Sequence, residues 1–426
     1  MMLLRSTTRS FAPLAAVLTL VTSSLAGQTA TGSEAPVARI RGDVHYLAED
    51  ARDGRGVGTE GIDEAAQYIA DQFRAAGLEP GGSEGYFQPF AISPTAPGVA
   101  HTDLGGAAVQ NVIGVLPGRG ALAGQVVVLG AHYDHLGMGI AAFSLEPDSV
   151  GVVHNGADDN ASGSVALLET ARRLAARNEA ARRTFVFVAF TAEELGTIGS
   201  QYYAAHPRLP NDSTVAMLNF DMVGRLRGDS LVVIGVGSAE EWQALVEAAN
   251  ADYGLVLAWQ QDPWGRSDHS SFYAQGVPVV HFFTDLHEDY HRTTDDWQKI
   301  NFEGVATIAA LAADLAWELA ISETPLTYVE VERPEPPATG RRRASLGTIP
   351  DMTDSPGGVR LTGVRSGSAA DEAGLRAGDI IVQIDRFEVR DLQGLQTALV
   401  SLSAGDTVTI VYVRDGRRLE TQATLR

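Results

Sequence analysis

The sequence predicts an α/β protein in which helices sandwich a mostly parallel mixed sheet, with a small β-rich domain after it. From about residue 110 onward, short apolar runs typical of strands alternate with longer stretches of helical periodicity. Such alternation favours a largely parallel sheet that helices cover on both faces. A proline-rich, charged linker is expected at 322–344, and the remainder, 345–426, contains short strand patterns and one helix. The total of 426 residues suits two or three domains.

The first 26 residues predict a secretory signal peptide. Arg5 and Arg9 give this segment a positive start, an apolar run covers 11–21, and small residues lead to a cleavage site after Ala26. The apolar run is shorter than the about 20 residues that a membrane-spanning helix needs. We therefore expect an exported protein, periplasmic or extracellular, without a membrane span.

The first large domain is expected over 37–321. Apolar residues at helical spacing predict helical structure over 37–78, and Gly77 would end it. Strands are expected at 111–116, 126–129, 184–190, 215–220, 231–234 and 279–283. Helices are expected at 161–176, 239–253 and 302–321. Because sites in open α/β sheets form at the carboxyl ends of the strands, the residues after each strand are the first candidates for chemistry.

The composition limits what that chemistry can be. A net charge of −21, from 32 basic and 53 acidic residues, argues against a sequence-independent grip on nucleic acid, which needs dense positive charge. The chain has no cysteine, which excludes disulfides, thiolate zinc sites and cysteine nucleophiles. Any metal must therefore be held by histidine, aspartate and glutamate.

Five segments carry histidine or carboxylate groups to one rim of the predicted sheet. Each group alone would usually be a cap or a solvated side chain, but their concurrence in this structural context favours a metal pair. Two divalent ions about 3.5–4 Å apart need a bridging carboxylate and further ligands on each side. With Asp159 as the bridge, each metal would receive three ligands from the set His132, Asp159, Glu194, Asp221 and His291.

Two further carboxylates have predicted roles beside these ligands. Glu193 and Glu194 are adjacent, so one can bind a metal while the other faces the metal-activated water as a general base. Asp134, two residues after His132, can accept the second N–H of that imidazole and fix its tautomer.

Several motifs resemble those of the M28 family of zinc aminopeptidases. They are Ala-His-Tyr-Asp-His-Leu-Gly at 131–137, Gly-Ala-Asp-Asp-Asn-Ala-Ser-Gly at 156–163, Ala-Glu-Glu-Leu-Gly at 192–196, Asn-Phe-Asp-Met-Val-Gly at 219–224, Gly-Arg-Ser-Asp-His at 265–269 and Tyr290-His291. The likeness covers the predicted first domain in order. It implies the zinc-dependent exopeptidase fold and hydrolysis of peptides that have a free N-terminus.

The resemblance also implies individual roles. Two Zn²⁺ ions are expected, one on His132 and Asp221 and the other on Glu194 and His291, with Asp159 between them and Glu193 as the general base. Tyr290 would hydrogen-bond the tetrahedral intermediate, and Arg266 and Asp268 would line the substrate pocket. A cis peptide is expected at Asp159–Asn160. No ligand role is expected for His135, His154, His269 or His287.

Three other functions compete with this hypothesis. The M20 peptidases use a similar ligand set, but they carry an inserted domain for which 221–291 leaves no room. Glutaminyl cyclases share the fold and part of the ligand set, and use one zinc. A catalytically inactive adaptor is the third alternative, although no ligand or base is missing from the sequence.

The segment 345–426 resembles a PDZ domain. Leu346, Gly347, Thr348 and Ile349 resemble its carboxylate-binding loop, and Leu392 begins a helix expected beside the peptide groove. An Asp415-Gly416 turn predicts a hairpin near the end of the chain. The resemblance implies binding of peptide or protein C-termini by addition of a strand to a sheet edge. A small domain that only stabilises the protein is the alternative.

Overall fold

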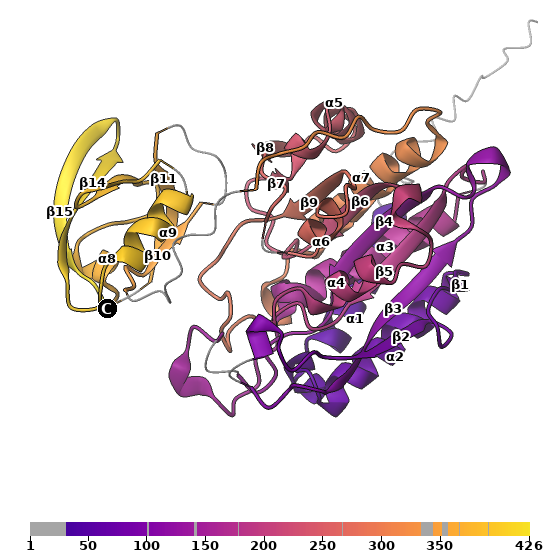
Figure 1. The fold of residues 1–426 in the computed structure, drawn as a ribbon, viewed down its shortest axis with the longest axis horizontal. Helices are drawn as coiled ribbons and strands as arrows, with labels where there is room; N and C mark the ends of the chain where they lie inside the picture. Colours follow the sequence, from indigo (N-terminus) through magenta and orange to yellow (C-terminus); the bar gives the residue numbers. More distant parts are fainter. Residues whose placement is uncertain are drawn as a thin grey trace, which may run out of the picture.

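The described part of the chain forms two sheets (Figure 1). Each sheet packs on its own hydrophobic core. The computed structural model describes residues 31–99, 102–139, 143–177, 179–265, 267–333, 344–351, 357–365, 367–390 and 392–426. The predicted signal peptide at 1–26, the candidate Arg266 and residues 334–343 of the predicted linker lie outside the described residues.

The large sheet has the strand order β1-β3-β5-β4-β6-β9-β7-β8, with β2 paired to β3. Strands β4, β5, β6 and β9 are parallel neighbours, so their carboxyl ends meet at one edge of the sheet. The strands are β1 (Glu79–Pro80), β2 (Phe87–Ala91), β3 (Ala108–Leu116), β4 (Val126–His132), β5 (Thr184–Phe190), β6 (Thr214–Phe220), β7 (Ser230–Ile234), β8 (Val256–Gln260) and β9 (Val279–Phe283).

Helices cover both faces of this sheet. One face packs against α1 (Thr31–Leu47), α2 (Glu60–Ala75), α3 (Gly163–Ala175), α5 (Trp242–Asn250) and α7 (Phe302–Ile321). The other face packs against the shorter α4 (Ile198–Ala205) and α6 (His269–Tyr273). The α/β sandwich that the sequence predicts is therefore confirmed, with β1, β2, β8, α4 and α6 as additional elements.

Helix α7 is apolar over its whole length. Among the described residues, it is the one helix long and apolar enough to cross a membrane, but 72% of its apolar window is buried inside the protein. It contacts α1, α3 and α5, and its apolar side chains form much of the core on that face. Its composition therefore reflects burial between helices and the sheet.

The helical prediction over 37–78 was wrong between α1 and α2. Residues 50–55 form short 3₁₀ turns, and Gly54 has a φ of +54°. A Cβ at Gly54 would lie 2.3 Å from the main-chain oxygen of His154, so the chain can pass here only with glycine. The break thus brings residues 54–56 into contact with Gly137 and His154, which both lie on the loop after β4.

The small sheet has the order β10-β11-β12-β14-β15, with β13 paired to β12. Its elements are β10 (Thr348–Pro350), β11 (Val359–Val364), α8 (Ala369–Glu372), β12 (Ile380–Ile384), β13 (Phe387–Glu388), α9 (Leu392–Ser401), β14 (Thr407–Arg414) and β15 (Arg417–Thr424). Asp415 and Gly416 both have positive φ, which confirms the predicted hairpin turn. Strand β10, which includes Thr348 and Ile349 of the predicted carboxylate loop, is an edge strand.

Candidate active site

The five predicted metal ligands meet at the carboxyl edge of the large sheet. His132 is the last residue of β4, Asp221 comes directly after β6, and Glu194 follows β5 by four residues. Asp159 lies in the irregular turn that precedes α3, and His291 lies in the loop after β9. Strand direction therefore explains why residues far apart in sequence arrive at one place.

The first group of ligands surrounds the imidazole of His132. Its Nε2 atom lies 3.4 Å from Asp159 Oδ1 and 3.4 Å from Asp221 Oδ1. One ligand atom from each of these three residues lies within 4.8 Å of the others. The geometry suits a divalent cation held by one nitrogen and two oxygens.

The second group shares Asp159 with the first. Nε2 of His291 lies 3.2 Å from Asp159 Oδ2 and 3.1 Å from Glu194 Oε2. The two oxygens of Asp159 thus face different histidines, which is the arrangement of a bridging carboxylate.

His135 also lies in the second group, where the sequence predicted no ligand role for it. Its Nδ1 lies 2.7 Å from Glu194 Oε1 but 3.9 Å from Asp159 Oδ2. His291 fits a ligand better, since its Nδ1 is 2.8 Å from the main-chain oxygen of Phe143, which leaves the Nε2 lone pair facing both carboxylates. We therefore interpret His135 as a hydrogen-bond donor to Glu194.

Asp134 contacts the site differently from the prediction. Nδ1 of His132 lies 3.2 Å from the main-chain oxygen of Asp134, whereas the Asp134 carboxylate is 3.8 Å away, beyond a hydrogen bond. The carboxylate instead accepts the backbone N–H groups of Glu193 at 3.0 Å and Glu194 at 3.3 Å. Asp134 therefore orients the turn that carries both glutamates, a contact that no sequence spacing indicates.

The two adjacent glutamates have opposite electrostatic environments. Burial, and next the negative charges of Asp268, Glu194 and Asp221, raise the pKa of Glu193 well above its usual range, although His132 opposes this. Burial would also raise the pKa of Glu194, but the imidazoles of His291 and His135 outweigh it and hold that pKa well below the usual range. Glu194 is therefore poised to stay ionised, and Glu193 to exchange a proton.

The site concentrates buried acidic groups. Burial raises the pKa of Asp134 to about 6 and that of Asp268 to about 7. For Asp221, burial again opposes ionisation, but the charge and hydrogen bond of His132, with the charge of His281 and a hydrogen bond from Ser267, together lower the pKa to about 2. So many buried carboxylates require compensating positive charge, and divalent cations would supply it at this donor set.

Arg55 lies fully buried beneath the site, and sequence analysis gave no signal for it. Its guanidinium donates to the main-chain oxygens of Tyr133 at 2.7 Å, Asn155 at 2.8 Å and Gly156 at 2.7 Å, and also to Leu47. Arg55 therefore ties the segment directly after His132 to the segment directly before Asp159.

The turn around Asp159 is held by its neighbours. The Asp159–Asn160 peptide is cis, as the resemblance implied. Asn160 Oδ1 accepts the N–H of Met222 at 3.1 Å, and its Nδ2 donates to the main-chain oxygen of Phe220 at 3.0 Å. These bonds fasten the bridging ligand to the segment that carries Asp221.

The remaining candidates lie around the same edge. The Tyr290 ring stacks on His291 at 3.9 Å between centroids, and burial and the charges of Asp159 and Glu194 raise its pKa well above the usual range. Its hydroxyl therefore keeps its proton and can donate a hydrogen bond. Asp268 is fully buried, and Glu193 lies within its electrostatic reach.

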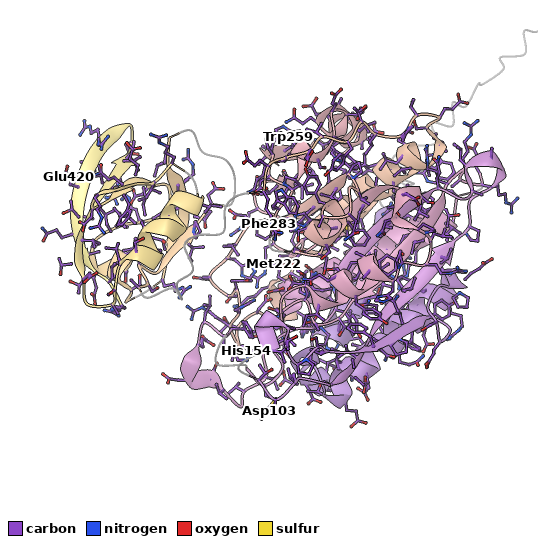
Figure 2. All side chains as sticks on the ribbon, viewed as in Figure 1. Asp103, His154, Met222, Trp259, Phe283 and Glu420 are labelled. Atoms are coloured by element: carbon purple, nitrogen blue, oxygen red, sulfur yellow. The ribbon has the colours of Figure 1, made fainter. Side chains whose placement is uncertain are left out.

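Histidines without a predicted ligand role are held elsewhere. His287 Nε2 lies 3.0 Å from Asp158 Oδ2, and His154 Nε2 lies 3.0 Å from Ser144 Oγ. His269 and His281 are buried, with their ring centroids 4.7 Å apart. Figure 2 labels His154, on the loop after β4, and Met222, which follows Asp221 after the end of β6.

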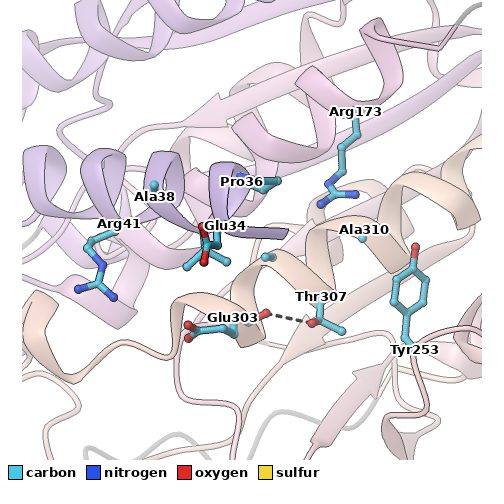
Figure 3. A pocket seen from close by; sticks show the side chains of 11 residues that line it. Glu34, Pro36, Ala38, Arg41, Arg173, Tyr253, Glu303, Thr307 and Ala310 are labelled. Atoms are coloured by element: carbon cyan, nitrogen blue, oxygen red, sulfur yellow. Dashed lines mark hydrogen bonds between the residues drawn. The ribbon is translucent and has the colours of Figure 1, made fainter. Parts of the chain in front are cut away.

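A separate hollow lies between α1 and α7 (Figure 3). Its volume is about 720 Å³, and its lining includes Glu34, Arg41, Arg173, Tyr253 and Glu303. None of the predicted ligands or catalytic residues lines it. The chemistry predicted from the sequence therefore belongs to the strand ends and not to this hollow.

The fold, with histidine and carboxylate groups at the strand ends, is that of the zinc-dependent exopeptidases. Residues 111–316 match the model of peptidase family M28, and residues 344–425 match that of the PDZ domain. The chain therefore contains an M28 peptidase domain and, on its C-terminal side, a PDZ domain.

Two named relatives are similar to this chain in sequence. Leucine aminopeptidase 1 of Uncinocarpus reesii is 29% identical over 231 residues, which are 50% of this chain and 55% of the relative. Leupeptin-inactivating enzyme 1 of Streptomyces exfoliatus is 27% identical over 284 residues, 66% of this chain and 56% of the relative. The chain thus spans little more than half the length of these relatives.

Solved structures share the fold. A zinc aminopeptidase from Bacillus subtilis superposes with a TM-score of 0.55 at 19% identity, over 67% of this chain and 96% of that protein. Porphyromonas gingivalis glutaminyl cyclase superposes with a TM-score of 0.52 at 18% identity, over 67% and 97%. These likenesses show the fold, and the fold by itself is compatible with either chemistry.

The buried Asp268 carboxyl predicts how the stability of the metal-free protein depends on pH. Its pKa of about 7 exceeds the about 3.9 of an unfolded aspartate, so the folded state retains a proton that the unfolded state releases. The stabilisation is complete below about pH 4 and is lost as the pH rises through 7. The side-chain amide of Asp268→Asn cannot ionise. The melting temperature of this variant minus that of the unsubstituted protein should therefore increase as the pH is raised from 4 to 8.

Melting of the metal-free proteins by circular dichroism checks this expectation. Glu247→Gln, which changes an exposed carboxylate on α5, is the control and should keep the pH slope of the unsubstituted protein. Equal slopes for Asp268→Asn and Glu247→Gln would contradict the assigned pKa.

Proposed function

We propose that this protein is an exported dizinc aminopeptidase that removes N-terminal residues from peptides. The observation that carries the proposal is Asp159, whose two oxygens lie 3.4 Å from His132 Nε2 and 3.2 Å from His291 Nε2. The family match and the names of the two characterised relatives support a peptidase that acts on N-termini.

The donor set fits zinc, because it offers imidazole and carboxylate ligands and no thiolate. His132 and Asp221 would hold one ion, Glu194 and His291 the other, and Asp159 both. When bound, the pair would lower the pKa of a shared water and polarise the scissile carbonyl.

The protein's own residues would then move the protons and orient the substrate. Glu193, whose pKa burial raises, accepts the proton of the attacking water and passes it to the leaving amine. Tyr290 keeps its hydroxyl proton and donates a hydrogen bond to the oxygen that becomes negative. Asp134 holds the Glu193 main chain in place.

An apolar cluster beside the ligands supports a preference for apolar N-terminal residues. Met222, Ile234 and Phe283 are buried together, and Leu286 and Tyr290 pack against them. Met222 follows Asp221 and Tyr290 precedes His291, so this cluster adjoins both proposed metal positions. A relative's name, leucine aminopeptidase, agrees with such a preference.

The domain organisation is part of the proposal. A signal peptide at 1–26 would direct export to the periplasm or beyond, 37–321 would form the peptidase domain, and 322–344 would link it to the PDZ domain at 345–426. Within the described residues, the N–H groups of Leu346 and Gly347 donate to no main-chain oxygen. We expect them to bind a terminal carboxylate, while the β10 edge would pair with the peptide.

Glutaminyl cyclisation is the second candidate, because a cyclase shares the fold. It would require activity on N-terminal glutamine without peptide cleavage. The presence of two histidine–carboxylate groups, one around His132 and one around His291, favours the peptidase, since a single metal would leave one of them without a function. An inactive PDZ adaptor has less support, as every proposed ligand and the base are in place.

The mature protein should hydrolyse aminoacyl-p-nitroanilides that have a free amine, leucine faster than lysine, and should not cleave their acetylated forms. Chelation should abolish the activity and zinc should restore it, because the metal-binding residues alone cannot hold the substrate in a reactive position. Absorbance of released nitroaniline measures each rate.

Cyclisation of glutaminyl peptides without any cleavage would transfer the assignment to the cyclase. A protein that binds two zinc ions but performs neither reaction would favour the adaptor.

Glu193→Gln should lower kcat by about 10²–10⁴-fold, because the amide cannot accept the proton of the attacking water. Zinc content, measured by atomic emission, should stay at the unsubstituted level, since Glu193 is not a proposed ligand. Glu247→Gln serves as the control and should keep full activity. A Gln variant with near-normal kcat, or one that loses its metal, would contradict the role of Glu193.

Peptides with a free C-terminal carboxylate should bind the full-length protein at least about 10-fold more tightly than the same peptides amidated, because charge-assisted hydrogen bonds to the loop are lost. Fluorescence anisotropy measures the affinity. Gly347→Ala should abolish binding, since its Cβ would lie 2.2 Å from Ser368 Cβ at a φ of +80°. Equal binding of both peptide forms would favour a purely stabilising domain.

A further inference from the structure

Asp295 is a fully buried carboxylate that the proposed chemistry does not use. It lies four residues after His291, in the loop before α7, and has no exposed surface. Its Oδ2 accepts the backbone N–H groups of Asp158 at 2.8 Å and of Asp159 at 3.1 Å. Its main-chain oxygen accepts the N–H of Ala157 at 3.0 Å. Three consecutive peptide N–H groups around the bridging ligand are therefore bound by this one residue.

The same side chain reaches the segment that carries Asp221. Asp295 Oδ1 accepts Nη2 of Arg225 at 2.9 Å, and Arg225 lies four residues after Asp221. Asp295 thus joins three ligand-bearing segments, those of Asp159, Asp221 and its own neighbour His291. A single buried carboxylate therefore couples the main chain at the bridging ligand to both proposed metal positions.

We propose that Asp295 is a positioning residue that fixes the bridging carboxylate of Asp159 relative to Asp221 and His291, an inference that rests on the proposed dizinc function. Asp159 can bridge two ions only if both of its oxygens keep their directions toward His132 and His291. A small rotation of the main chain at Asp159 would swing these oxygens away from one metal position. The two N–H bonds to Asp295 oppose that rotation.

Asp295 is itself held by a chain of ion pairs. Arg225 Nη2 also lies 3.2 Å from Asp289 Oδ2, and Asp289 Oδ1 accepts Nζ of Lys299 at 2.5 Å. Lys299, the only lysine in the sequence, is partly exposed. Asp289 therefore shares the Arg225 guanidinium with Asp295. Its carboxylate also accepts hydrogen bonds from Lys299 and from the Thr294 hydroxyl, whereas that of Asp295 accepts the N–H groups at Asp159. This difference makes Asp289 a matched control.

Asp295→Asn tests the proposal in the full-length mature protein. The amide has one acceptor oxygen, so it cannot serve both Arg225 and the two N–H groups. We expect the affinity for the second zinc ion to fall about 10- to 100-fold, measured by competition with a chromophoric chelator. Raising free zinc should restore kcat. Asp289→Asn should change the affinity less than about 3-fold.

Each further outcome decides between explanations. Unchanged stepwise zinc affinities in folded Asp295→Asn would overturn the proposal, and a lower melting temperature of its metal-free form alone would show a merely structural role. If Asp295→Asn does not fold, Arg225→Met replaces it, and its affinity for the second zinc ion should fall about 3- to 10-fold. Unchanged affinity would again overturn the inference. Unsubstituted protein that binds fewer than two zinc ions would instead overturn the proposed function.

Discussion

The burial of many carboxylates at one edge of a sheet is the constraint on which the rest of this structure depends. Parallel strands β4, β5 and β6 end together and deliver these groups to one place, where unpaired negative charge would be strongly unfavourable. Imidazoles beside Asp221 and Glu194, and backbone N–H groups at Asp134, stabilise part of this negative charge. The remaining imbalance is what the proposed metal ions would neutralise.

The scaffold beneath the ligands shows how that arrangement is maintained. Arg55 donates only to main-chain oxygens, so it fixes loops without taking a carboxylate away from the site. Asn160 and Asp295 fasten the turn of Asp159 from two sides. These contacts join segments that are distant in sequence, and each is buried, which makes the ligand geometry a property of the whole domain.

Proteins with this fold can catalyse different reactions. An aminopeptidase and a glutaminyl cyclase both superpose on the chain, so the sheet alone does not select a reaction. The difference must lie in which side chains reach the strand ends and in what lies next to them. Here the second histidine–carboxylate group and the apolar cluster around Met222 and Phe283 are the features that favour a peptidase.

Periodicity and motif spacing alone determined the alternation of strands and helices, the approximate ranges of β4–β7, β9 and α7, and the group of five candidate ligands. Their success has a physical reason, because buried parallel strands require continuous apolar runs and their ends share one edge. Only the tertiary structure decided that the chain breaks at Gly54, that His135 lies against Glu194, and that Asp134 binds the glutamate turn. Those features depend on contacts between segments that no local pattern records, such as the approach of Gly54 to His154 and the reach of Arg55 and Asp295 across several loops.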